Sequence, residues 1–259
     1  MELSVIIVNY NVKHYVERCI ESVQTAMQGI DGEIIVIDNA STDGSVAYLR
    51  QRFADVTVME SGANLGFSRA NNRAIRQSKG EYVLLLNPDT TVAPDVLRAC
   101  LDFAHEHPRL GAIGVRMHNE DGSVAPESRR AIPTPWIALT KYLGDGRRYY
   151  MSHLPWDQPC RIEVVSGAFC FLQRQAFMQA GMLDEDYFMY GEDIELSYQL
   201  LRRGYENWYL PLDIVHYKGR STRKTSFRYA YVFYKAMVIF FIKRYLPFIP
   251  IYRYDKRQH

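Results

Sequence analysis

Hydrophobic residues along this 259-residue chain form short apolar runs that alternate with segments of helical periodicity. Short runs bounded by turn signals predict strands at Leu3–Val8, Glu33–Ile37, Val56–Met59, the centre of Lys79–Thr90, Ala112–Met117 and Glu163–Phe169. Helical patterns occupy Lys13–Met27, a segment up to about Phe53, Ser68–Gln77, Asp95–Glu106, a short segment ending at Gly181, and a segment ending at Arg203. This alternation predicts an α/β fold with a mainly parallel sheet, flanking helices and right-handed crossovers.

The stretch Lys79–Thr90 is the centre of this pattern. Its apolar run predicts a strand buried on both faces, and Pro88 ends the strand because proline cannot donate to a sheet ladder. Asp89 is therefore predicted just past the carboxyl end of a central strand, where open α/β sheets bind ligands. Two interpretations stay open. The carboxylate could hold a divalent cation together with substrate phosphates, or the turn could cap a helix beginning near Pro94.

Two further polar side chains, Asn9 and Asp38, also follow predicted strands. Polar ends on three strands predict a ligand crevice at the carboxyl edge of the sheet. The chain has no Gly-x-Gly-x-x-Gly after its first strand and no Gly-Lys-Ser/Thr. Phosphates bound without either loop are expected to be held through a metal, which favours the cation interpretation of Asp89.

Two later clusters carry candidate chemistry. Glu192 and Asp193 open a predicted helix, where acids are favoured by capping and by the helix dipole. One of them could equally serve as a general base, because an acceptor hydroxyl becomes acidic only as its new bond forms. His216 ends a short apolar run and could be a buried core residue or, near a diphosphate, a metal ligand. Basic residues that follow it would suit a departing phosphate.

The segment Glu127–Pro159 is rich in Pro, Arg and aromatic residues and includes the pair Arg129-Arg130. A long irregular segment inside a compact domain is more often a functional loop than a linker, so a functional loop is predicted here.

Composition narrows the cellular context. Hydrophobic residues make up 47% of the chain, as in ordinary globular proteins, and the four cysteines show no paired metal-ligand spacing. The chain opens directly into Leu3–Val8, with no basic region and cleavage site around it. No stretch of about 18 uncharged apolar residues is present. We therefore expect a cytoplasmic protein with free thiols and no membrane span.

Charge is unevenly distributed. From Lys218 onward the chain has eleven Lys and Arg against one acid, which leaves 20 basic and 28 acidic residues before it. Aromatic residues alternate with these cations, which predicts a tail that binds the anionic inner face of the cell membrane. Within the tail we expect Tyr231, Val238 and Phe241 to pack on the body. The charges expected to contact lipid and to be replaceable without harm to the core are Lys243, Arg244, Lys256 and Arg257.

Seven segments, in order, resemble the family-2 glycosyltransferases of the GT-A (Rossmann-like) fold, and most nearly their bacterial rhamnosyltransferase-like branch. The matching segments are Ser4–Asn11, Asp38–Ser45, Asn64–Asn72, Leu86–Asp89, Ser166–Phe169, Phe188–Asp193 and His216–Gly219. The resemblance spans roughly residues 3 to 245, and seven ordered segments are far more specific than any one of them. It implies an inverting enzyme that transfers a sugar from a nucleotide-diphosphate sugar to a glycan or lipid-linked acceptor in polysaccharide synthesis.

The resemblance also implies residue roles. Residues 1–117 would bind the donor, 118–217 would form the acceptor and catalytic half of the same domain, and 218–259 would form the tail. The implied nucleotide-sugar contacts are Asn9, Asn11, Asp38, Asn64, Gly66, Asn71, Asn87 and Gly167. Asp89 and His216 would bind Mg²⁺ or Mn²⁺, and Asp193, with Glu192 beside it, would be the base. Asn87 stands where the family's metal motif has its first acid, so strict metal dependence stays open.

Two other functions are considered. A catalytically silent sugar-nucleotide-binding or scaffolding subunit is disfavoured because both Asp89 and Asp193 are retained. A nucleotidyltransferase would need a glycine- and basic-rich loop after the first strand, where Asn9-Tyr10-Asn11-Val12 stands instead. No nucleic acid partner is expected. The donor sugar, its base, the acceptor and the oligomeric state are not identified by the sequence.

Overall fold

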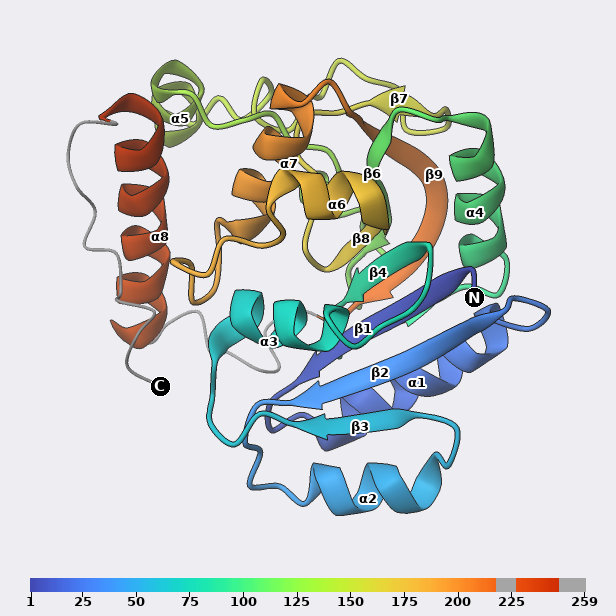
Figure 1. The fold of residues 1–259 in the computed structure, drawn as a ribbon. Coiled ribbons are helices and arrows are strands. Elements are labelled where there is room, and N and C mark those ends of the chain that lie inside the picture. The colour runs from blue at the N-terminus through green and yellow to red at the C-terminus, as the bar shows by residue number, and fades with distance from the viewer. Residues whose placement is uncertain (218–226, 247–259) are drawn as a thin grey trace.

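The computed structural model describes residues 1–217 and 227–246, with side chains in the second range from Tyr231 onward. The described residues form one nine-stranded sheet with helices on both faces (Figure 1). The strands are β1 (Leu3–Asn9), β2 (Gly32–Asp38), β3 (Thr57–Glu60), β4 (Tyr82–Leu86), β5 (Thr90–Val92), β6 (Leu110–His118), β7 (Cys160–Arg161), β8 (Phe169–Gln173) and β9 (Glu206–His216). The helices are α1 (Lys13–Ala26), α2 (Ser45–Arg52), α3 (Gly66–Ile75), α4 (Val96–Glu106), α5 (Pro135–Tyr142), α6 (Arg174–Ala180), α7 (Glu192–Arg202) and α8 (Phe227–Tyr245), with a 3₁₀ turn at Pro126–Ser128.

Strand order along the sheet is β3-β2-β1-β4-β8-β6-β9-β5, and β7 pairs with β9. The strands β1, β2, β3, β4, β6 and β9 run in one direction, whereas β5, β7 and β8 run the other way. The predicted α/β class with a mainly parallel sheet is confirmed. Because β2, β1 and β4 are neighbours, their polar carboxyl ends lie together, as the sequence predicts.

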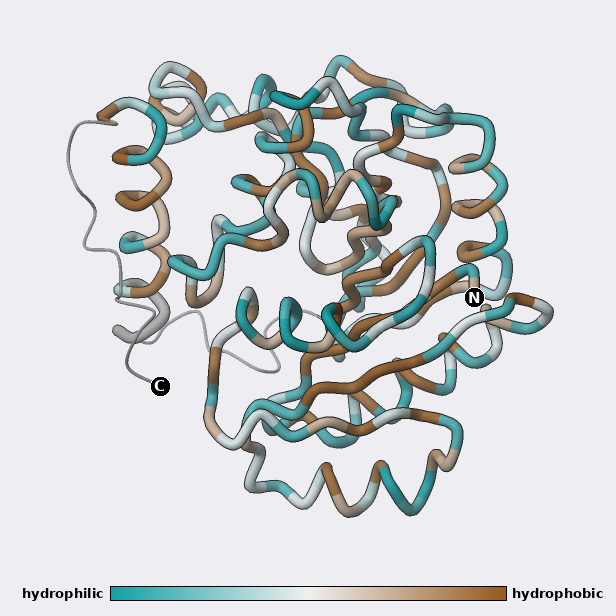
Figure 2. The backbone as a smooth tube through the Cα atoms, viewed as in Figure 1, coloured by the Kyte–Doolittle hydropathy of each residue, from teal (hydrophilic) through white to brown (hydrophobic). Residues whose placement is uncertain are grey.

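The core has two layers, one on each face of the sheet. Alternate residues of β1 divide between them: Leu3, Val5 and Ile7 pack toward α1 and α4, whereas Ile6 and Val8 pack toward α3, α6 and α7. The tube through the central strands is accordingly brown in Figure 2. All of β4 is buried, which confirms the predicted two-faced central strand.

Two of the strands that differ from the prediction lie beside the candidate site. The strand expected at Glu163–Phe169 begins only at Phe169, since Gly167 and Ala168 form a turn in which the Phe169 amide donates to the Ser166 carbonyl at 3.3 Å. The second is β5, which follows Asp89 at once and pairs with β9. Asp89 therefore does not cap the helix near Pro94, and the capping interpretation is wrong.

The segment Glu127–Pro159 is less irregular than predicted because it contains α5. Thr134 is the N-cap and accepts a hydrogen bond from the Ile137 amide at 3.3 Å, while Pro135 occupies the first helical turn. Both residues favour a helix start at these positions.

The inward face of α8 also differs from the prediction. Ala236, Ile239 and Phe240 are buried against Tyr187 and Ile194. In contrast, the three residues expected to pack on the body are exposed, namely Tyr231, Val238 and Phe241.

The last-turn cations of α8 turn inward. Lys243 binds Asp186 at 2.6 Å and also Asp184, and Arg244 is paired with Glu195. The expectation that Lys243 and Arg244 are free surface charges is therefore wrong. Lys256, Arg257 and the basic residues just after His216 lie outside the described residues. Among the helices of the described ranges, none has the length and apolar character needed to cross a bilayer.

Candidate active site

The donor end of the candidate site begins with Asn9 and Asp38, which are register partners on β1 and β2. The Asn9 amide Nδ2 donates to Asp38 Oδ2 at 2.7 Å, and both side chains are buried. Asp38 Oδ1 accepts from the Ser41 backbone amide at 2.8 Å. Asn9 Oδ1 is buried and has no hydrogen-bond partner among the described residues. Since a buried polar atom without a partner is costly, this oxygen is available to a ligand donor.

Loops beside this pair are held by side-chain hydrogen bonds. Asn11 Oδ1 accepts from the Thr42 amide at 2.7 Å, so Asn11 shapes the loop that follows Asp38. Asn39, which sequence analysis did not single out, is buried and donates to the Gly66 carbonyl at 3.0 Å. Its only sequence signal is its place in the Asp38–Ser45 stretch.

Gly66 brings the Asn64–Gly66 loop into contact with Phe188, which lies in the segment that leads to Glu192 and Asp193. Its φ of 79° lies in the left-handed region, and an added Cβ would lie 2.4 Å from the Phe188 carbonyl oxygen. The neighbouring Phe67 amide donates to that same oxygen at 2.7 Å. Asn64 braces the turn by accepting from the Gly66 amide at 3.1 Å. Asn71 instead donates within α3, to the Phe67 carbonyl at 3.0 Å.

The candidate metal residues lie together beyond β4. His216 Nε2 is 3.3 Å from Asp89 Oδ1 and 3.4 Å from the side-chain nitrogen Nδ2 of Asn87. His216 Nδ1 is buried without a partner among the described residues. A carboxylate, an imidazole and an amide oxygen are ligands that a divalent cation accepts. No group of three His, Cys, Asp or Glu side chains gathers within residues 1–217 and 227–246, so further oxygens would have to come from substrate or water.

The candidate base lies in the first turn of α7. Asp193 Oδ2 accepts from Arg130 Nη2 at 2.5 Å and from the Gly167 amide at 3.3 Å, and Oδ1 accepts from the Ile194 amide at 2.8 Å. Glu192 is buried, and its Oε2 has no partner among the described residues. Burial, and next the charge of Asp193, raise the pKa of Glu192 to about 8. The two acids therefore differ: Glu192 favours its protonated form at neutral pH, whereas Asp193 faces a cation.

A single turn connects the metal residues to the base. The backbone amide of Asn87 donates to the Ala168 carbonyl at 3.0 Å, and the backbone amide of Gly167, one residue before Ala168, donates to the Asp193 carboxylate. Asn9, Asp38, Asp89, Gly167, Asp193 and His216 thus belong to one edge of the sheet. They come from segments that are far apart in the sequence.

Residues 4–179 match the model of the family described as glycosyl transferase family 2. This chain belongs to that family. It is 31% identical, over 93% of its length and 84% of the relative's, to the N-acetylglucosaminyl-diphospho-decaprenol L-rhamnosyltransferase of Mycobacterium tuberculosis. It is 32% identical to the low-salt glycan biosynthesis hexosyltransferase Agl10 of Haloferax volcanii, over 78% of the chain and 62% of that protein. The family and enzyme class predicted from the sequence are confirmed.

Solved structures support the fold. The mannosyltransferase PcManGT of Pyrobaculum calidifontis, in complex with GDP-Man and Mn²⁺, superposes with a TM-score of 0.60 at 21% identity. That comparison covers 83% of this chain and 56% of the mannosyltransferase. The first 349 residues of Staphylococcus aureus TarS give a TM-score of 0.60 at 17% identity, over 84% of this chain and 60% of that one. At these identities the likeness concerns the fold alone.

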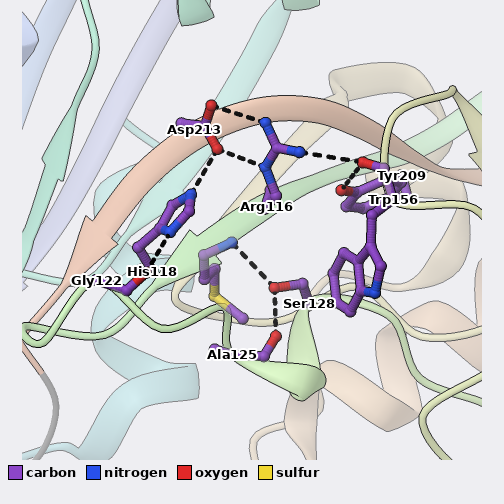
Figure 3. A network of polar contacts seen from close by, with 9 residues as sticks. Arg116, His118, Gly122, Ala125, Ser128, Trp156, Tyr209 and Asp213 are labelled. Carbon is purple, nitrogen blue, oxygen red and sulfur yellow. Dashed lines mark hydrogen bonds and ion pairs between the residues drawn. The ribbon is translucent and has the colours of Figure 1, made fainter. Parts of the chain in front are cut away.

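In this glycosyltransferase a polar network fastens the segment that carries Arg130 to the sheet (Figure 3). Asp213 on β9 accepts from both Arg116 and His118 on β6, at 2.9 Å from Arg116 Nη2 and 2.6 Å from His118 Nε2. Arg116 also reaches the Trp156 carbonyl at 3.3 Å. Ser128 accepts from the Met117 amide at 2.9 Å. The segment that follows β6 is therefore fixed at both of its ends.

Proposed function

We propose that this protein is an inverting glycosyltransferase that uses a nucleotide-diphosphate sugar and glycosylates a hydroxyl of a lipid-linked glycan during cell-surface polysaccharide synthesis. The observation that carries the proposal is the turn at Gly167–Ala168, which bonds to the Asp193 carboxylate on one side and to Asn87, next to Asp89 and His216, on the other. A base and a diphosphate-binding group on one edge are what an inverting transfer needs.

The donor end would be residues 1–117 and the acceptor end residues 118–217. Asn9, Asp38 and the Asn64–Gly66 loop would contact base and ribose, an assignment supported by the unpartnered buried Asn9 oxygen. A lipid-diphosphate-linked acceptor and a rhamnosyl or hexosyl donor are favoured by the names of the two relatives.

In the reaction, Asp193 takes the proton of the acceptor hydroxyl as its oxygen bonds to the anomeric carbon. The bond from that carbon to the diphosphate breaks on the opposite face, and the electron pair leaves with the nucleoside diphosphate, so the configuration inverts. Asp89 and His216 would hold Mg²⁺ or Mn²⁺, which when bound stabilises the negative charge of the leaving diphosphate. Asn87 and Gly167 would orient the diphosphate and the base.

The proposal is tested with purified protein and a panel of nucleotide sugars, first by thermal shift and then by transfer to a soluble polyprenyl-diphosphate glycan analogue. Asp193→Asn should bind donor as wild type does and lose turnover by about 10² or more. Asp89→Ala should remain folded and lose both donor affinity and transfer. Normal transfer by either folded variant would contradict the role given to that residue, and no transfer by wild type on the whole panel would contradict the proposed activity.

Membrane contact is the remaining part of the proposal. The outward face of α8 presents Tyr231, Tyr234, Val238 and Phe241, with the side chain of Tyr234 among the most exposed at 68%. Neither α5 nor α8 contains an acid, and Lys235 on α8 is exposed. Aromatic residues among cations suit the anionic interface of a bilayer, where each nearby Lys or Arg contributes about 1 kcal/mol.

Because Lys243 and Arg244 face the body, apolar residues make the sharper test of membrane contact. We expect the triple change Tyr234→Ser, Val238→Ser and Phe241→Ser to lose co-sedimentation with anionic vesicles, with melting temperature and transfer to the soluble analogue unchanged. The control is Met178→Ser, an exposed apolar residue on α6. Equal sedimentation of the triple variant and wild type would rule out this face.

A further inference from the structure

Arg130 is a charged residue that contacts the candidate base, Asp193, from outside α7. It lies between the 3₁₀ turn and α5, 63 residues before Asp193 in the chain. Its Nη2 donates to Asp193 Oδ2 at 2.5 Å and to the Val165 carbonyl at 3.3 Å. The Arg130 and Asp193 side chains are 11% and 15% exposed, so this ion pair is largely shielded from solvent.

The main chain around Arg130 is held independently of that ion pair. The Val164 amide donates to the Arg130 carbonyl at 2.9 Å, and the Ala131 amide donates to the Tyr149 carbonyl at 2.8 Å. Arg129 is fully buried, stacks 3.5 Å from the Trp156 ring centroid and donates to the Pro155 carbonyl at 2.7 Å. With the backbone fastened on both sides, the Arg130 guanidinium is aimed at Asp193 before any substrate arrives.

The charges around the base are unbalanced without Arg130. Glu192 and Asp193 are adjacent carboxyl groups, and neighbouring carboxylates cannot both ionise freely. Cys170 and Tyr149 also lie beside the Arg130–Asp193 ion pair, and burial, then the charge of Asp193, raise the pKa of the Cys170 thiol. Burial is the largest single effect on the pKa of the Arg130 guanidinium and lowers it, but Asp193 and Tyr149 together outweigh burial, so the pKa is raised overall. Beyond Arg130 lies Lys141, whose pKa is lowered by burial and then by the Arg130 charge.

We propose that Arg130 is a positioning residue that orients Asp193 as the base, compensates the charge of its carboxylate, and links the acceptor-side segment to it. This inference rests on the proposed transferase function. Oδ2 is taken by Arg130 and the Gly167 amide, which leaves a lone pair of Oδ1 for the acceptor proton.

The test compares Arg130→Gln and Arg130→Lys with Arg147→Gln, the same change at an 83% exposed arginine of the same segment. We expect Arg130→Gln to lower kcat by about 10-fold or more while leaving the donor KM unchanged. The acidic limb of its pH–rate profile should move to higher pH, because the cation beside the base is gone. Arg130→Lys should keep the wild-type limb and recover part of kcat, and Arg147→Gln should match wild type.

An Arg130→Gln profile that superimposes on wild type would overturn the inference, as would a loss that appears only in melting temperature. If that variant does not fold, an acidic limb in Arg130→Lys that differs from wild type overturns it equally, and an unchanged limb with reduced kcat supports it. Failure of the proposed function is recognised separately, since wild type would then transfer no sugar or Asp193→Asn would turn over normally.

Discussion

Replacing Arg244 by Met would leave the Glu195 carboxylate buried without its cation. The Arg244 and Glu195 side chains are only 9% and 5% exposed, and the guanidinium also stacks 3.9 Å from the centre of the Tyr198 ring. Removing one member of a buried ion pair costs about 3–5 kcal/mol, because the other charge stays desolvated. Gln199 still donates to Glu195 at 2.7 Å, so the lower end, about 3 kcal/mol, is expected.

That loss of stability corresponds to a melting temperature lower by about 6–12 °C in a protein of this size. Lys243→Gln should cost less than about 1 kcal/mol, because its partners Asp184 and Asp186 are partly open to solvent and the interaction is screened. Lys235→Gln, an exposed change on the same helix, is the control and should be neutral.

Urea unfolding of the Arg244→Met and Glu195→Gln single variants and of the double variant completes a mutant cycle. The double variant should recover most of the stability lost by Arg244→Met, because no buried charge then lacks a partner. An Arg244→Met variant within about 1 kcal/mol of wild type, with no coupling to Glu195, would refute the buried-pair reasoning.

Two further outcomes are expected. The pKa of Glu192 is raised, so the stability that its protonated form contributes is lost as the pH rises toward 8. The melting temperature of Glu192→Gln minus that of wild type should therefore increase steadily from pH 5 to pH 8, and a constant difference would contradict this. Burial raises the pKa of all four cysteine thiols, but Cys19, Cys100 and Cys170 are buried whereas Cys160 is only half-buried, so a thiol reagent should label Cys160 far faster than the other three in the native protein. Labelling of all four at one rate would contradict this.

Elements with a strong local pattern were predictable from the sequence. The apolar β4, the fully buried β1, the helical periodicity of the buried residues of α1, and the stop at Gly181 all depend on neighbours within a few residues. The ends of β1, β2 and β4 were also predictable, because a parallel sheet brings such ends to one edge. Family membership followed from the order of seven segments, and it holds.

Other features required the tertiary structure. No local pattern links Arg130 to Asp193 or Arg244 to Glu195, because the two residues of each pair are 63 and 49 positions apart in the sequence. The prediction for the inward face of α8 is wrong because this helix carries apolar residues on all of its sides, so periodicity does not identify the buried one. The start of β8 was misplaced because a short apolar run looks the same wherever a turn interrupts it. Sequence pattern identifies the buried residues of an element only where its apolar positions have a clear period, whereas the pairing of distant charges depends on how the buried elements pack together.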